Sequence, residues 1–224
     1  MPLVIDTAFS NSTSKLPDAN RLTIGLVNNM PDAALETTER QFLDLIRAAT
    51  PDVVANFKLY WIPEVQRAEN VWKDHARRYR DISELWDTHL DGLIVTGAEP
   101  RAAKLGDEPY WATLARLVDW AREQTTSTIW SCLAAHAAVL HSHGIEREPF
   151  GEKLFGVYDC EVINPDPLLE RVVRPLQVPH SRYNGLSEAA LADAGYRLLV
   201  RSAGAGVGTT GSSRPAREVP RGPR

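Results

Sequence analysis

Residues 128–144 read TIWSCLAAHAAVLHSHG, and this stretch decides the fold. A short β-prone run ends at Ser131, and an alanine-rich segment then continues to His143 and stops at Gly144, which predicts a strand that runs directly into a helix. A cysteine at such a junction lies in a strand-turn-helix elbow, beside backbone N–H groups and the helix dipole. That environment favours a nucleophilic thiol and supplies part of an oxyanion hole. A buried structural role for Cys132 is the alternative.

The same alternation of strand and helix extends outward from this elbow. Buried strands are predicted at 22–27, 57–62 and 92–96, and amphipathic helices from Thr37 to the residues before Pro51 and around 114–121. This order predicts an α/β domain with a doubly wound, mostly parallel sheet flanked by helices, because each right-handed crossover places a helix over the sheet. Further strands are expected at 154–162 and 196–200, one of them antiparallel at an edge.

Composition narrows the class of protein. The 25 basic and 29 acidic side chains give a formal charge of −4, which argues against nucleic-acid or membrane partners. Two cysteines form neither a disulfide framework nor a zinc pattern, and no apolar stretch is long enough to span a membrane, so the cytoplasm is expected. A single domain is predicted over residues 1–202. The segment 203–224, rich in Gly, Pro and Arg, is predicted to be a disordered tail.

Ligands of parallel α/β sheets gather at the carboxyl ends of the strands, and three segments meet there: 28–32, 96–101 and the neighbours of Cys132. His136 follows Cys132 by one helical turn, and its reach to the sulfur is doubtful. His180 lies in a polar segment that reads as a site loop, with a plain loop as the alternative. Cys160, inside an apolar strand pattern, is assigned a structural role.

Six collinear motifs between residues 21 and 202 carry a family resemblance. They are GLVNNMP at 25–31, TERQ at 38–41, GLIVTGA at 92–98, CLAAHAA at 132–138, EKLFGVY at 152–158 and PHSRY at 179–183. The chain resembles the homoserine O-succinyltransferase and O-acetyltransferase family of methionine biosynthesis. That resemblance implies a fold similar to class I glutamine amidotransferases, which is flavodoxin-like.

The resemblance also implies an activity. An acyl group would pass from an acyl-CoA co-substrate to the hydroxyl of L-homoserine through a thioester on Cys132, with no metal and no resident cofactor. A homodimer is expected. The implied site residues are the oxyanion N–H groups of Leu133 and of the loop with Gly97 and Ala98, a lysine near the acyl donor, Lys153, and a serine of the substrate pocket, Ser181.

The family selects its acyl donor through a residue shortly after the Thr-Gly-Ala motif. Counting from Thr96 without gaps places Arg101 there, and its guanidinium suits the free carboxylate of a succinyl group. Aligning the proline instead places Ala102 there, which leaves room for succinyl. Glu99, if turned inward, would favour acetyl. Succinyl-CoA is mildly preferred.

Departures from the family pattern leave a second hypothesis about the function open. The family base is the histidine of a downstream His-Pro-Glu segment, and no histidine follows His180. A family lysine just after the Met-Pro pair is missing, since Asp32, Ala33 and Ala34 stand there, and the homoserine-binding arginine helix is missing too. The sequence after Ser202 therefore resembles a truncated or frame-shifted reading frame, and impaired activity is expected. The alternative is a non-catalytic amidotransferase-like module that binds a metabolite or another protein.

Overall fold

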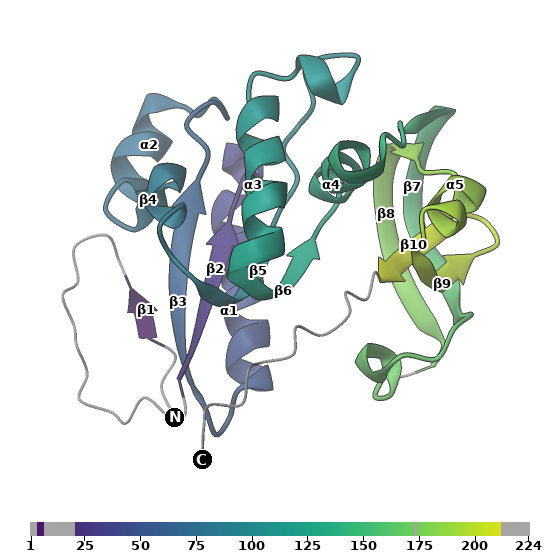
Figure 1. Ribbon diagram of the computed structural model, residues 1–224, viewed down its shortest axis with the longest axis horizontal. Coiled ribbons are helices and arrows are strands. Elements are labelled where there is room, and N and C mark those ends of the chain that lie inside the picture. The colour runs from purple at the N-terminus through teal and green to yellow at the C-terminus, as the bar shows by residue number, and fades with distance from the viewer. Residues whose placement is uncertain (1–3, 7–20, 173, 212–224) are drawn as a thin grey trace, which may run out of the picture. The chain divides into compact units, whose positions relative to one another are not determined.

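The computed structural model describes residues 4–6, 21–172 and 174–211 (Figure 1). Contacts within the chain divide it into two compact units, residues 1–142 and 143–224. Sequence patterns predicted a single domain over residues 1–202, whereas the contacts divide this segment between residues 142 and 143. No helix in the described ranges is both long enough and apolar enough to cross a membrane.

The first unit contains a parallel sheet whose strand order is β1-β3-β2-β5-β6, with β4 beside β3. Every pair in this sheet is parallel, as the alternation of strands and helices predicted. β2 pairs with β3 on one side and with β5 on the other, so the strand order reverses between β2 and β5. The strands are β1 (Val4–Asp6), β2 (Arg21–Val27), β3 (Val54–Trp61), β4 (Tyr79–Asp81), β5 (Leu90–Val95) and β6 (Thr125–Trp130).

Helices connect these strands and lie on both sides of the sheet (Figure 1). α1 begins at Asp32, earlier than the expected Thr37, because Pro31 precedes the first turn and the acidic Asp32 suits a helix N-terminus. The first turn, DAAL at 32–35, has one large apolar side chain, Leu35, which alone sets no helical period. The helices are α1 (Asp32–Ala49), α2 (Glu69–His75), α3 (Trp111–Gln124) and α4 (Leu133–His143).

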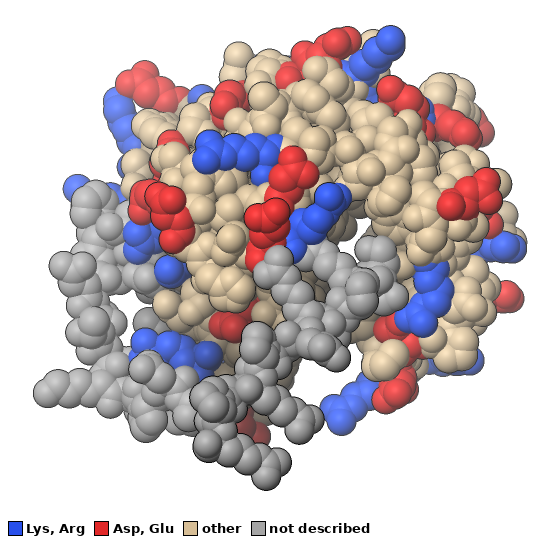
Figure 2. Space-filling view, in the orientation of Figure 1, with Lys and Arg blue, Asp and Glu red and all other residues tan. Residues whose placement is uncertain are grey.

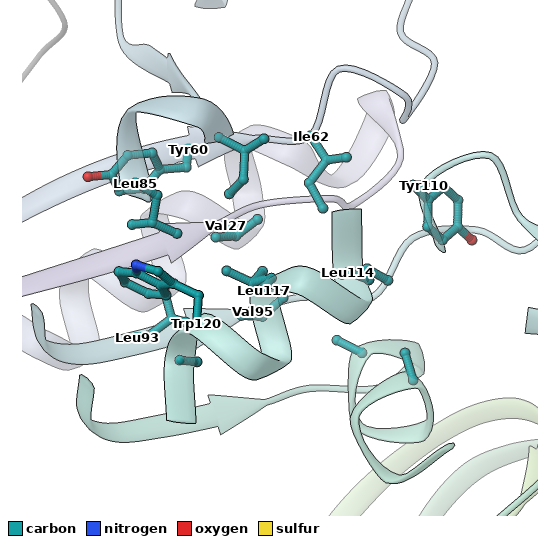
Figure 3. Close-up of a cluster of buried hydrophobic side chains, with 14 of the residues drawn as sticks. Val27, Tyr60, Ile62, Leu85, Leu93, Val95, Tyr110, Leu114, Leu117 and Trp120 are labelled. Carbon is teal, nitrogen blue, oxygen red and sulfur yellow. The ribbon is translucent and has the colours of Figure 1, made fainter. Parts of the chain in front are cut away.

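The core of the first unit has two layers, because successive side chains of a strand point to opposite faces of the sheet. Leu26 packs with Leu35 and Leu43 of α1 on one face. Val27, its neighbour, belongs to the cluster on the other face, where Leu117 of α3 is fully buried (Figure 3). A strand covered on both faces explains the uninterrupted apolar run at 22–27.

The second unit is an antiparallel four-stranded sheet in the order β10-β9-β7-β8. The strands expected at 154–162 and 196–200 are present, but they belong to this separate sheet and not to an edge of the parallel one. The elements are β7 (Glu148–Val162), β8 (Leu176–Gly185), α5 (Glu188–Asp193), β9 (Arg197–Ser202) and β10 (Gly206–Gly211).

Two sequence predictions are wrong in this unit. The segment 206–211 is not disordered but forms β10, because pairing with β9 uses backbone groups and needs few apolar side chains. Residues 212–224 of the predicted tail lie outside the described residues. The segment 179–183 is not a loop but the middle of β8, an edge strand, and edge strands tolerate a proline such as Pro179.

Candidate active site

Cys132 occupies a sharp turn between β6 and α4. Its backbone φ is 56°, and within the described ranges it is the one non-glycine residue with positive φ. An L-residue keeps that conformation only where its surroundings enforce it. Here Ser131 N donates to the Val95 carbonyl at 2.9 Å, and Ala135 N donates to the Cys132 carbonyl at 3.0 Å. Cys132 is exposed, so the predicted elbow is present and the buried alternative does not apply.

The loop after β5 lies against the first turn of α4. A Cβ atom on Gly97 would lie 2.7 Å from the backbone nitrogen of Leu133 and 2.9 Å from its Cβ, closer than real side chains allow. Glycine is therefore required for this approach. Leu133 is the first residue of α4, where an N–H has no carbonyl of its own helix to bond. The structure thus brings Gly97 and its neighbour Ala98 beside Leu133, next to Cys132 in the chain.

Asn29 joins the carboxyl ends of β2 and β5. Its backbone N–H donates to Oγ1 of Thr96 at 2.7 Å, and its side-chain amide donates to the Thr96 carbonyl at 3.1 Å. These residues lie where the strand order reverses, the place where open α/β sheets bind ligands. The predicted convergence of segments 28–32 and 96–101 is confirmed.

Asn28 belongs to a buried network that sequence reasoning missed. Its side-chain amide donates to the Tyr79 hydroxyl at 3.0 Å, and that hydroxyl donates to Oε2 of Glu39 at 3.0 Å. The Arg78 guanidinium pairs with the same carboxylate. Burial, reinforced by the Glu39 carboxylate, raises the pKa of Tyr79, so its hydroxyl remains a donor at neutral pH.

Arg67 holds the loop that follows β2. Its guanidinium donates to the carbonyls of Asn28 at 2.8 Å and Met30 at 3.0 Å, and to the Asp32 carboxylate at 3.1 Å. The Arg67 side chain is only 4% exposed. Asp32, in the segment where the family resemblance leads one to expect a lysine, is therefore the partner of a buried arginine. The signal in the sequence was an arginine shortly after the end of β3, in a stretch without clear periodicity.

A cavity of about 210 Å³ opens among the loops at the carboxyl end of this sheet. The Arg101 side chain lies at its wall and donates to the side-chain oxygen of Gln66. Glu99 lines the same cavity, which therefore carries groups of both signs. Asn29, Gln66 and Tyr110 also line this cavity.

Lys153 and Ser181 lie in the second unit. Lys153 Nζ is 5.3 Å from the ring centre of Phe155 and 5.6 Å from that of Tyr183. Ser181 is paired in register with Phe155 across β7 and β8, and both are exposed. Lys153 also lines a cavity of about 370 Å³ within this unit. The structure thus places the two predicted residues on neighbouring strands of one sheet.

His180 and Cys160 have structural surroundings. His180 packs edge to face on Tyr158, and burial, with the Arg182 charge, lowers its pKa, so it is neutral at pH 7. Arg182 donates to the carbonyls of Ala205 and Val207. Cys160 is 7% exposed, and its burial raises the pKa of its thiol, in agreement with the structural role assigned to it.

His136 lies within α4, one turn after Cys132, as predicted. In the part of the chain that the structure describes, no group of three or more His, Cys, Asp and Glu side chains has a metal-binding arrangement. On the face shown in Figure 2, basic and acidic side chains are interspersed, as the near balance of 25 basic and 29 acidic residues leads one to expect.

Comparisons with the sequences of known proteins show the family of this chain. A family model described as homoserine O-succinyltransferase matches residues 6–219. The chain is 52% identical over 189 residues to homoserine O-succinyltransferase of Rhodopseudomonas palustris, covering 84% of this chain and 57% of the relative. It is 49% identical over 203 residues to that of Bradyrhizobium japonicum, covering 90% and 62%. The chain thus spans 57% and 62% of the lengths of these two relatives.

A solved structure supports the fold. The chain is similar to a Thermoplasma acidophilum protein whose description assigns it to GMP synthase, with a TM-score of 0.54 and 19% identity. The match covers 84% of this chain and 77% of the other. The amidotransferase-like fold expected from the sequence motifs is therefore confirmed.

Proposed function

The chain belongs to the homoserine O-succinyltransferase family, and on that premise we propose that it transfers a succinyl group from succinyl-CoA to the hydroxyl of L-homoserine. The observation that carries this proposal is the exposed Cys132, held at φ 56° between strand and helix. A nucleophile in such an elbow projects from the turn and is free to meet an acyl group.

The first half-reaction uses groups of the first unit. The Cys132 thiolate attacks the thioester carbonyl of succinyl-CoA, and its sulfur forms a new bond to that carbon. The N–H groups of Leu133 and of the Gly97–Ala98 loop stabilise the oxyanion of the tetrahedral intermediate. When the intermediate collapses, the bond to the CoA sulfur breaks and CoA leaves as a thiolate that takes up a proton.

The second half-reaction returns the enzyme to its starting state. The hydroxyl oxygen of homoserine attacks the succinyl-cysteine carbonyl and loses its proton, and the Cys132 thiolate leaves. The same N–H groups serve this second intermediate because the acyl carbon is again bonded to Cys132. Lys153 and Ser181 are proposed to contact the substrates, as the family resemblance implies.

Succinyl is the proposed acyl group for two reasons. The relatives are named as succinyltransferases, and Arg101 lies at the wall of the cavity, where its guanidinium can pair with a second carboxylate. Glu99 at the same cavity opposes this preference, so the balance between the two side chains sets the donor.

Product formation tests the proposal. The chain is incubated with succinyl-CoA and L-homoserine, and O-succinylhomoserine is measured by mass spectrometry beside a Cys132→Ala variant. The proposal requires the ester from the wild-type chain and none above background from the variant. Equal ester from both would contradict it, and no ester from either would favour the module that binds a metabolite without turning it over.

The remaining expectations are proposals of the same kind. A homodimer is proposed, and sedimentation velocity of the purified chain tests it. A cytoplasmic location is proposed because both cysteines are free thiols, and fractionation of the producing cells tests it.

A further inference from the structure

Glu108 has a buried side chain that accepts hydrogen bonds from the backbone of residues earlier in the same loop. It is 3% exposed and stands just before α3. Its Oε1 accepts the backbone N–H of Arg101 at 2.7 Å and that of Ala102 at 2.8 Å. One oxygen that accepts two successive N–H groups fixes the direction of both peptide planes.

The backbone of Glu108 is itself anchored. Its N–H donates to the Leu105 carbonyl at 3.2 Å, and its carbonyl accepts the N–H of Trp111 at 2.9 Å. Trp111 begins α3, and Leu114 and Leu117 of that helix are buried in the core. The Glu108 side chain therefore connects the segment at Arg101 to the start of α3, a helix that is packed into the core.

That segment leads from the oxyanion loop to the wall of the cavity. At one end, Gly97 packs against the backbone of Leu133. At the other end, the Arg101 side chain reaches Gln66 at the cavity wall. The clamp by Glu108 thus acts on the two residues, Arg101 and Ala102, that the alignments place at the donor-selecting position.

We propose that Glu108 is a positioning residue for donor choice: it holds the backbone at Arg101 and Ala102 so that the Arg101 guanidinium faces the cavity. Glu108 touches neither the acyl group nor Cys132 in this role. The inference deepens the proposed function and rests on it for the identity of the donor. The clamp itself is a property of the folded chain and is measurable without any substrate.

Two variants separate the clamp from the bulk of the side chain. Glu108→Ala removes the acceptor, whereas Glu108→Gln keeps one acceptor oxygen at the same reach and replaces the other oxygen by an NH2 group. Glu123→Ala, at an exposed position near the end of α3, is the matched control. For each chain, the rate of acyl transfer to Cys132 is measured with succinyl-CoA and with acetyl-CoA, and the ratio of the two rates is compared.

We expect Glu108→Ala to lower the succinyl-to-acetyl ratio about tenfold or more, since misplacement of a binding group by about 1 Å costs up to 10²-fold. Glu108→Gln should restore most of the ratio, and Glu123→Ala should keep the wild-type value. A ratio within twofold of wild type for a folded Glu108→Ala chain overturns the inference, because a purely structural loss lowers both rates together.

Hydrogen exchange of the Arg101 and Ala102 amides gives a second readout. Both amides should be protected in the wild-type chain and in Glu108→Gln, and should exchange at least about tenfold faster in Glu108→Ala. Unchanged exchange overturns the clamp. If neither CoA ester labels wild-type Cys132, the proposed function fails, and this exchange comparison alone decides whether Glu108 positions the segment.

Discussion

The backbone nitrogen of Leu133 lies 2.7 Å from the place where residue 97 would carry its Cβ, and residue 97 is a glycine. The two residues come from different strand-to-helix connections, one after β5 and one after β6. Their contact places the loop after β5 beside the first turn of α4, next to the exposed Cys132. The proposed oxyanion site therefore depends on parallel strands that end at the same edge of a sheet.

Gly97→Ala should reduce acyl transfer to Cys132 about 10²- to 10³-fold, the usual cost of losing one oxyanion donor. The added methyl group must push the loop away from Leu133, so the N–H groups no longer converge. Quenched-flow labelling with succinyl-CoA measures the rate. Gly106→Ala is the control, because a Cβ there meets no atom within 4 Å. Equal rates for the two variants would contradict this account of the loop.

Arg67→Ala should lower the free energy of unfolding by about 2 kcal/mol or more, because it leaves the Asp32 carboxylate and two backbone carbonyls without their buried donor. Arg67→Lys should recover only part of this loss, since one ammonium does not reproduce the planar fork of the guanidinium. Urea unfolding followed by tryptophan fluorescence provides the measurement.

The control for Arg67 is Arg47→Ala. Arg47 pairs with Asp44 on the surface of α1, where both side chains are more than half exposed. Such a pair contributes less than about 1 kcal/mol. A loss at Arg67 no larger than the loss at Arg47 would show that the clamp on the loop after β2 contributes little.

Alkaline pH should destabilise the chain partly through Tyr79. Its pKa is raised above the ordinary value of 10.0, first by burial and then by the Glu39 carboxylate. Above that value the unfolded chain loses the phenol proton while the folded chain keeps it. The stabilisation is therefore complete below pH 10 and is lost as the pH rises, by up to about 1.4 kcal/mol per pH unit.

Urea titrations at several pH values test the role of Tyr79. The variant Tyr79→Phe should be less stable at pH 7, where Asn28 and Glu39 lose their partner, and should show a shallower decline above pH 10. Tyr183→Phe, which removes an exposed hydroxyl, is the control. An unchanged slope in Tyr79→Phe would assign the alkaline loss to other groups.

Local patterns were sufficient to predict four strands of the parallel sheet, β2, β3, β5 and β6, but not the three-residue strands β1 and β4. The runs at 22–27, 57–62 and 92–96 are mostly apolar and show no strict alternation, a pattern typical of strands that are buried on both faces. β8 and β10 escaped prediction because an edge strand tolerates Pro179, and because the pairing of β10 depends on backbone groups that composition does not report. The first turn of α1 was missed because Leu35 is its one large apolar side chain and sets no period by itself.

The residues of the candidate site also divide into those with a local sequence signal and those without one. Cys132 was found because its elbow is a local feature of one continuous segment. Glu39 and Tyr79 are 40 residues apart in the chain, and Arg67 and Asp32 are 35 apart, so only the folded sheet brings each pair together. A single sequence holds no periodic signal for such partners.

The central claim is that Cys132 carries the acyl group, and intact-mass and peptide mass spectrometry after exposure to succinyl-CoA without homoserine test it most directly. One succinyl group should appear per chain, on the peptide that contains Cys132. It should persist in Cys160→Ser and disappear, or form far more slowly, in Cys132→Ser. Labelling that stays on the chain in Cys132→Ser and maps to Cys160 would contradict the account.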